Sequence, residues 1–257
     1  MGVLKGKTAL VTGGSRGIGR AVAERLARDG ALVAVHYGHR EEAAKETVAA
    51  IEAAGGRAFT IGAELGVPGD AQALWAAYGA HPLATERVDV LVNNAGAATF
   101  AGIEETDEET FQRVQALNAQ APFFVIKYGL ERLNDGGRIV NVTGTPALAL
   151  PAILATIMAK GAVNALTVSL AAALAPRGIT VNSVGPGIIE TDLNAAWLAD
   201  PAARAHAASR SVFGRVGTAP EVADVVAFLA SEDSRWVTGQ HLDATGGLQL
   251  ALQPAGV

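Results

Sequence analysis

A glycine-rich stretch near the N-terminus constrains the fold more than any other feature of this sequence. Residues 12–19 read TGGSRGIG, between an apolar run at 8–12 and a segment with apolar residues at 18, 22 and 26. The run predicts a buried strand, and the four-residue spacing predicts one face of a helix that Gly30 ends. Glycines at such a junction allow a tight turn and let the backbone approach a phosphate at the helix N-terminus. The stretch therefore predicts a phosphate-binding loop, with a purely structural glycine turn as the alternative.

Short β-rich runs alternate with helix-length segments along the rest of the chain. The predicted strands are 8–12, 32–36, 58–61, 88–93, 138–142, 180–184 and 241–243. Most are continuous apolar runs, which is typical of strands covered on both faces. Apolar residues at 111, 114 and 117 predict a further helix. With no repeat or linker, the alternation predicts one α/β domain over 1–257, a Rossmann-type doubly wound parallel sheet flanked by helices.

Composition excludes several classes of function. The 257 residues are 50% hydrophobic, which rules out a disordered chain and allows one domain with a large core. The net charge is −5 and no basic run occurs, so neither nucleic acid nor an anionic membrane is expected as a partner. The absence of cysteine excludes disulfides, thiolate nucleophiles and cysteine metal sites, and no metal site is predicted. The longest apolar stretch, around 147–155, is too short to span a bilayer, and no signal-peptide pattern is present, so a cytoplasmic protein is expected.

Further motifs agree with one family. The spacing T-G-x3-G-x-G resembles that of the short-chain dehydrogenase/reductase superfamily, and the resemblance covers residues 5 to about 250. The other motifs are NNAG at 93–96, Asn118 in NAQAPFF, Pro186-Gly187, Thr191, VTGQ at 237–240 and Gly246-Gly247. The resemblance implies a nicotinamide dinucleotide cofactor and a homotetramer or homodimer, formed through the helices that hold Asn118 and Lys160 and through the last strand.

The resemblance also implies the cofactor-binding residues. They are Gly13, Ser15, Arg16, Gly17, Ile18, Gly19, Tyr37, Arg40, Glu64, Leu65, Asn94, Ala95, Gly96, Lys160, Pro186, Gly187, Ile189 and Thr191. Relatives that prefer NAD carry an acid at the end of the second strand, where it binds the ribose 2′-hydroxyl. Residues 35–40 read VHYGHR here, without an acid, and Arg16 and Arg40 could pair with a 2′-phosphate. NADP(H) is therefore favoured over NAD(H), unless Arg40 is only a solvated residue at a helix start.

The catalytic positions depart from the family pattern, which is Asn, Ser and then Tyr-x-x-x-Lys. Lys160 is present, but Thr156 stands four positions earlier, one helical turn away on the same face. The serine that ends the fifth strand maps to Gly144 in the segment IVNVTGT, where Thr143 or Thr145 could shift into the gap. The predicted catalytic set is therefore Asn118, Thr143, Gly144, Thr156 and Lys160.

The missing tyrosine restricts the chemistry. A phenol has a pKa near 10, which a neighbouring lysine lowers, whereas a threonine hydroxyl is far too weak an acid to replace it. Loss of a positioned acid costs about 10²–10⁴-fold in rate. None of the three tyrosines, at 37, 78 and 128, maps beside the nicotinamide. Ketone reduction or alcohol oxidation by the usual route of the family is therefore not expected.

Three hypotheses follow. The first is redox chemistry on a substrate that needs no tyrosine proton donor, such as an iminium, a hemiaminal or a conjugated system. The second is a non-redox cyclase or isomerase that keeps the dinucleotide as a structural element and works by orientation and electrostatics. The third is a catalytically silent subunit that pairs with an active homologue. The intact phosphate loop and Lys160 favour the first two.

The substrate is expected to bind under residues 188–215, which correspond to the lobe that covers the substrate in the family. Trp197 and His206 are the predicted contacts within it, and Thr145 and Leu148 are predicted to form the opposite wall. Each could instead be a surface or packing residue. Gly144 frees space where a serine would stand, so the expected partner is a bulky, largely apolar small molecule, as in secondary metabolism.

Overall fold

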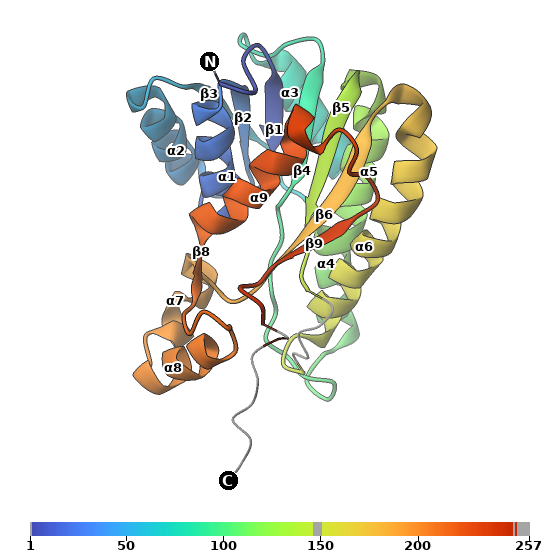
Figure 1. Cartoon of the computed structure of the whole chain (residues 1–257). Coiled ribbons are helices and arrows are strands. Elements are labelled where there is room, and N and C mark those ends of the chain that lie inside the picture. Colours follow the sequence, from blue (N-terminus) through green and yellow to red (C-terminus); the bar gives the residue numbers. More distant parts are fainter. Residues whose placement is uncertain (1, 146–150, 249, 251–257) are drawn as a thin grey trace.

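Seven parallel strands form the central sheet of the computed structural model, which describes residues 2–145, 151–248 and 250. The strands are β1 Thr8–Val11, β2 Leu32–Tyr37, β3 Arg57–Gly62, β4 Val88–Asn93, β5 Leu133–Val142, β6 Thr180–Pro186 and β9 His241–Ala244. Their order is β3-β2-β1-β4-β5-β6-β9, so the direction of winding reverses between β1 and β4 (Figure 1). This is a doubly wound sheet, as predicted, and ligands bind such sheets at the reversal, beyond the carboxyl ends of the strands.

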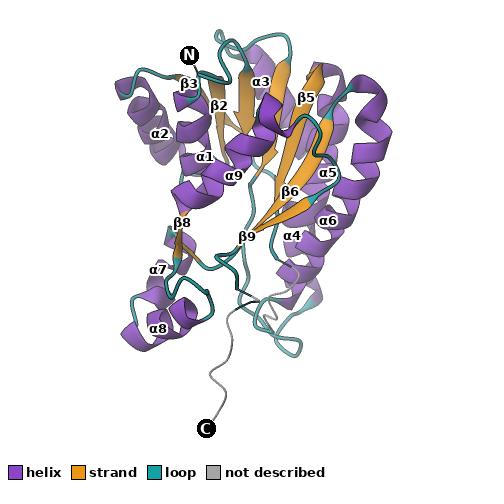
Figure 2. Ribbon diagram, viewed as in Figure 1, coloured by secondary structure: helices purple, strands orange, loops and turns teal. Residues whose placement is uncertain are grey.

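Helices cover both faces of this sheet (Figure 2). They are α1 Gly17–Arg28, α2 Glu41–Ala53, α3 Asp70–Ala80, α4 Glu108–Gln115, α5 Ala121–Gly129, α6 Leu154–Leu174 and α9 Ala219–Ala230. Two further helices, α7 Asp192–Leu198 and α8 Pro201–Ser209, and the short strands β7 Ile189–Glu190 and β8 Gly217–Thr218 form a lobe beyond the carboxyl edge of the sheet (Figure 1).

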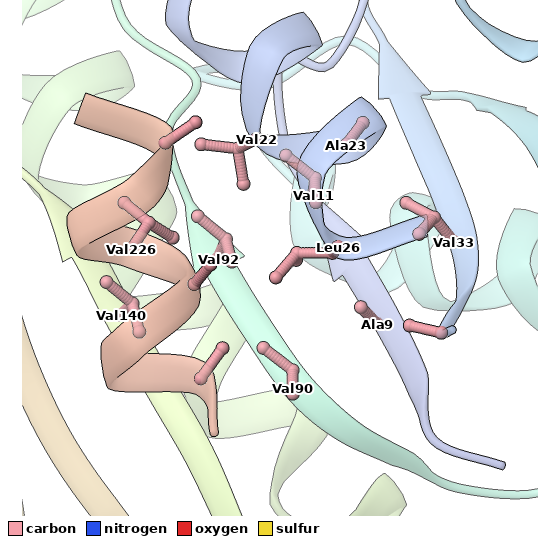
Figure 3. Packing of buried hydrophobic residues seen from close by; sticks show 14 of the residues in the cluster. Ala9, Val11, Val22, Ala23, Leu26, Val33, Val90, Val92, Val140 and Val226 are labelled. Atoms are coloured by element: carbon pink, nitrogen blue, oxygen red, sulfur yellow. The ribbon is translucent and has the colours of Figure 1, made fainter. Parts of the chain in front are cut away.

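The alternation of side chains along each strand builds two cores. Ala9 and Val11 of β1 pack with Leu26 of α1 and Val226 of α9 on one face (Figure 3). Leu10 joins the core on the opposite face, which α3, α5 and α6 cover. Full burial of each Leu or Val side chain contributes about 1.5–3 kcal/mol. Burial on both faces explains why these strands are continuous apolar runs in the sequence.

The strand bounds differ most from prediction at β5. This strand begins at Leu133, which pairs with Val88 of β4, and the register shifts before Arg138 pairs with Val90. The intervening residues 134–137, Asn-Asp-Gly-Gly, carry no apolar signal, so the sequence pattern indicated only the second half of the strand.

Two helical segments differ from the sequence prediction. The helix predicted around 111–117 is α4, and it continues through a π-helical turn, Ala116–Gln120, into α5. The segment Leu154–Arg177, α6 and the turn after it, is long and apolar enough to cross a membrane by length and composition, and 28% of its 18-residue apolar window is buried. The sequence prediction placed the longest apolar stretch around 147–155 and so missed this segment. In this fold it packs along β6 and contributes Ala171 and Leu174 to the core.

Candidate active site

A cavity of about 620 Å³ lies at the carboxyl ends of β1, β4, β5 and β6, between the sheet and α7. Most of the residues predicted for the site line it, although they come from segments far apart in the sequence. They are Gly13, Ser15, Arg16, Gly17, Ile18, Gly19, Arg40, Glu64, Leu65, Asn94, Ala95, Gly96, Asn118, Thr143, Gly144, Thr145, Thr156, Lys160, Pro186, Gly187, Ile189, Thr191 and Trp197.

Two of the predicted contacts, Tyr37 and His206, are not among the lining residues. Tyr37 packs against the core on the α1 and α9 side of the sheet, because its side chain and that of His36 point to opposite faces of β2. His36 lines the cavity in its place. His206 is exposed on α8 and does not line the cavity. Leu148 lies outside the described residues.

The loop after β1 is held in shape by its glycines and by His36. Gly13 and Gly17 have φ angles of 64° and 54°, and a Cβ at Gly19 would lie 2.1 Å from the carbonyl oxygen of Gly13. The Gly13 N–H donates to Nδ1 of His36 over 3.1 Å, and Nε2 of His36 lies 2.8 Å from the carbonyl oxygen of Ala63. Burial lowers the pKa of His36 to about 4, so the ring is neutral at pH 7 and donates from Nε2.

The N-terminus of α1 suits an anion. Its N-cap residue, Arg16, makes no capping hydrogen bond with its side chain, and the first turn holds no acid. The N–H groups of the first turn and the helix dipole are therefore available to a phosphate. The opposite side is fixed by Asn94, whose Nδ2 donates to the carbonyl oxygens of Thr12 and Gly13. A Cβ at Gly96 would lie 2.6 Å from Oδ1 of Asn118, so the floor of the cavity also requires glycine. The residues present thus fit a dinucleotide.

Two arginines lie at the edge of this surface. Arg40 is exposed and lines the cavity, and within the described parts of the chain it forms no ion pair. The neighbouring carboxylates, Glu41 and Glu42, instead pair with Lys45 at 3.0 and 2.8 Å. Arg40 is the exposed N-cap residue of α2, so its pairing with a 2′-phosphate and the alternative of a solvated residue at a helix start both stay predictions. Arg16 is also half-exposed and meets a carboxylate of α7 at 3.6 Å.

The lysine and asparagine predicted to be catalytic lie together at the inner end of the cavity. Nζ of Lys160 donates to the carbonyl oxygen of Val142 over 3.0 Å, and burial lowers the pKa of Lys160 to about 8. Asn118 sits on the π-helical turn, and its Nδ2 donates to the carbonyl oxygen of Ala97 over 3.0 Å. Such turns recur at functional sites.

The residues at the positions where the resemblance implies a serine and a tyrosine border the same space. Thr156 is only 7% exposed, and its Oγ1 has no hydrogen-bond partner among the described residues. A Cβ at Gly144 would meet nothing within 4 Å, so the space beside this glycine is open. Oγ1 of Thr143 lies 3.4 Å from the carbonyl oxygen of Val184 and so faces β6, while Thr145 is buried at the cavity wall.

The remaining wall is apolar. Trp197 of α7 lines it, and its Nε1 donates to Oδ1 of Asn194 over 3.1 Å, which fixes the indole. Sequence reasoning missed further apolar residues of the cavity, several of which only the folding of distant loops brings together. They include Phe100, Ile153, Ile157 and Leu193.

Comparisons with known proteins agree with this geometry. Residues 13–249 match the family described as enoyl-(acyl carrier protein) reductase. The chain is 39% identical to an uncharacterised oxidoreductase of Methylorubrum extorquens, over 97% of this chain and 100% of that protein. It is 36% identical to a hydroxynaphthalene reductase of Aspergillus fumigatus, over 92% of this chain and 90% of that protein.

Solved structures of similar proteins also share this fold. The angucycline C-6 ketoreductase LanV with bound NADP is 47% identical, with a TM-score of 0.91 over 97% of this chain and 98% of that chain. The reductase LugOII of lugdunomycin biosynthesis is 49% identical, with a TM-score of 0.91 over 96% and 99%. A short-chain dehydrogenase/reductase of Serratia marcescens is 36% identical, with a TM-score of 0.87 over 95% and 98%. Fold and site define a Rossmann-type dinucleotide-binding protein. The chain belongs to the short-chain dehydrogenase/reductase family.

Proposed function

We propose that the protein is an NADP(H)-dependent oxidoreductase of secondary metabolism whose reaction takes no proton from residue 156. One observation carries the proposal: Thr156 and Lys160 line the same cavity as the residues that fit a dinucleotide, and the family resemblance implies the proton donor at position 156. The similarity to a ketoreductase solved with NADP and to hydroxynaphthalene reductases supports the cofactor and the kind of substrate.

The chain would hold the cofactor with residues already in position. The N–H groups at the start of α1 would bind the pyrophosphate, and Arg16 and Arg40 would bind a 2′-phosphate by charge-assisted hydrogen bonds. The family resemblance assigns the nicotinamide ribose to Lys160. When bound, NADP(H) supplies or accepts a hydride at the inner end of the cavity.

The acid–base groups near this end set the kind of substrate. Lys160 is mostly protonated at pH 7, because its pKa is about 8, whereas Thr156 is too weak an acid to give up a proton. Substrates that need no proton from a tyrosine meet this condition. They include iminium and hemiaminal carbons, conjugated systems and ketones that carry their own acid. The apolar wall with Trp197 fits a bulky, largely apolar molecule.

We also propose a homodimer or homotetramer. Apolar side chains on the outer faces of α5 and α6 are well exposed in the single chain, with Phe123, Met158 and Val168 at 44%, 62% and 59%. Surfaces of this kind are typical of protein–protein contacts. Sedimentation analysis tests the proposal, and a monomer at micromolar concentration would contradict it. The cytoplasmic location stays a prediction.

Calorimetric titration of the pure protein with NADPH and with NADH tests the cofactor assignment. We expect micromolar binding that favours NADPH. Equal binding of the two would remove the assignment of Arg16 and Arg40 to the 2′-phosphate. Binding of neither would refute the proposed redox function and would favour a cofactor-free isomerase or a silent subunit.

A further inference from the structure

We propose that the substrate supplies the proton itself, through a phenolic hydroxyl placed next to its reacting carbonyl and bound beside Thr156 and Lys160. This inference rests on the proposed function and adds the chemical class of the substrate. It would be an aryl ketone with a hydroxyl group ortho or peri to the carbonyl.

The space for such a ring is present. Thr156 replaces a tyrosine in the family pattern, so most of the volume of a phenol is missing from the chain at this position. The cavity continues over Gly144, where an added Cβ would meet nothing within 4 Å. Ile153, Ile157 and Phe100 line the same cavity, and Phe100 is 62% exposed. These apolar side chains suit the faces of a flat aromatic ring.

Two polar groups in this apolar surrounding have spare hydrogen-bonding capacity. Oγ1 of Thr156 is buried without a partner among the described residues, and a hydroxyl left in this state costs about 1–3 kcal/mol. Lys160 lies one helical turn further on, and its ammonium has three donors. One of these donates to the carbonyl oxygen of Val142. A phenolic oxygen between the two side chains would accept from Lys160 and satisfy Thr156.

The described lining offers no other acid at this end of the cavity. Its carboxylates are Glu64 and Asp192, which lie beside His39 and Arg16, each at 3.6 Å. His36 is neutral and serves the phosphate loop. A phenol next to an ammonium reproduces the pair that the family obtains from its tyrosine and lysine, because the cation lowers the pKa of the phenol from about 10.

In the proposed step, hydride from the reduced nicotinamide dinucleotide forms a C–H bond at the carbonyl carbon, and the π bond of the carbonyl breaks. The O–H bond of the phenol breaks, and its proton moves to the former carbonyl oxygen, which becomes an alcohol. The dinucleotide is oxidised to NADP⁺. The ammonium of Lys160 stabilises the phenolate, which then takes a proton from water.

The first test needs no turnover. The probes are 1-naphthol and its methyl ether, bound to the protein with NADP⁺ present. We expect the absorbance of bound 1-naphthol to show a phenol pKa lowered by one or more in the wild type, and a smaller lowering in Lys160→Met. We expect Thr156→Val to weaken the binding of 1-naphthol by about 10-fold and to leave the affinity for the methyl ether unchanged. An unshifted phenol in the wild type, or equal losses for both probes, would overturn the inference.

The second test compares two isomeric ketones. In 8-hydroxy-1-tetralone the hydroxyl reaches the carbonyl oxygen, and in 5-hydroxy-1-tetralone it does not. The rates at which borohydride reduces the two free ketones correct for their intrinsic reactivity. After this correction, the kcat/KM of the wild type with NADPH should be higher for the 8-hydroxy isomer by about 100-fold or more. Thr156→Tyr should raise the rate for the 5-hydroxy isomer and bring the ratio close to one.

The outcomes separate the two proposals. Equal rates for the isomers in the wild type, or equal rates for 8-hydroxy-1-tetralone and its methyl ether, overturn the substrate-supplied proton and leave the oxidoreductase intact. The same holds if NADPH binds and the wild type reduces neither isomer. Failure of NADPH to bind overturns the proposed function and the inference together.

Discussion

Acidification should destabilise the protein through His36, which links β2 to the phosphate loop. Its folded pKa is about 4 and its ordinary pKa is 6.5, so the unfolded chain binds the proton more readily. Between these values the unfolded state carries more protons than the folded state, and stability therefore falls as the pH falls from 6.5 to 4. The difference of 2.5 in pKa corresponds to about 3 kcal/mol, lost in full only below pH 4.

Urea denaturation at a series of pH values measures this effect. His36→Asn is the matched control, because asparagine can still accept from the N–H of Gly13 but cannot be protonated. The free energy of unfolding of the wild type should fall relative to that of the variant by about 3 kcal/mol between pH 7 and pH 4. Parallel curves for the two proteins over this range would refute the reasoning.

Two further predictions concern the cofactor surface. Arg16→Ala and Arg40→Ala should each weaken the binding of NADPH by roughly 10- to 100-fold, because each loses one or two charge-assisted hydrogen bonds to the 2′-phosphate. Calorimetry should show the binding of NADH nearly unchanged. Equal losses of affinity for the two cofactors would contradict the 2′-phosphate assignment. Gly19→Ala should abolish NADPH binding or folding, because its Cβ would lie 2.1 Å from a backbone oxygen of the loop. Gly161→Ala is the control, since a Cβ there meets nothing within 4 Å, and thermal denaturation should show it more stable by about 0.5–1 kcal/mol. Normal NADPH binding by Gly19→Ala would contradict the structure of the loop.

The sequence predicts the sheet well because both of its faces are covered. Leu10 and Val11 are buried in opposite cores, which makes β1 a continuous apolar run. The same reasoning fails where pairing does not depend on apolar residues, as in the first half of β5.

The candidate site is predictable where a motif fixes the backbone and less so where orientation matters. The residues of the phosphate loop and Lys160 line the cavity as expected. Sequence reasoning chose Tyr37 over His36, because it followed position along the chain rather than the alternation that turns neighbouring side chains to opposite faces. Phe100 and Leu193 were missed because the wall they form depends on loops whose course no local pattern specifies.

The most direct test of the central claim introduces the serine and the tyrosine of the family pattern. Gly144→Ser with Thr156→Tyr should give measurable reduction of 1-tetralone by NADPH, at least 100-fold above the wild type in kcat/KM, because a positioned acid returns beside Lys160. The open space at Gly144 accepts the serine. NADPH affinity, measured on the same samples, shows that the variant is folded. The account predicts this gain with wild-type affinity for NADPH. Rapid reduction of 1-tetralone by the wild type, or a folded, NADPH-bound double variant with no gain, would contradict it.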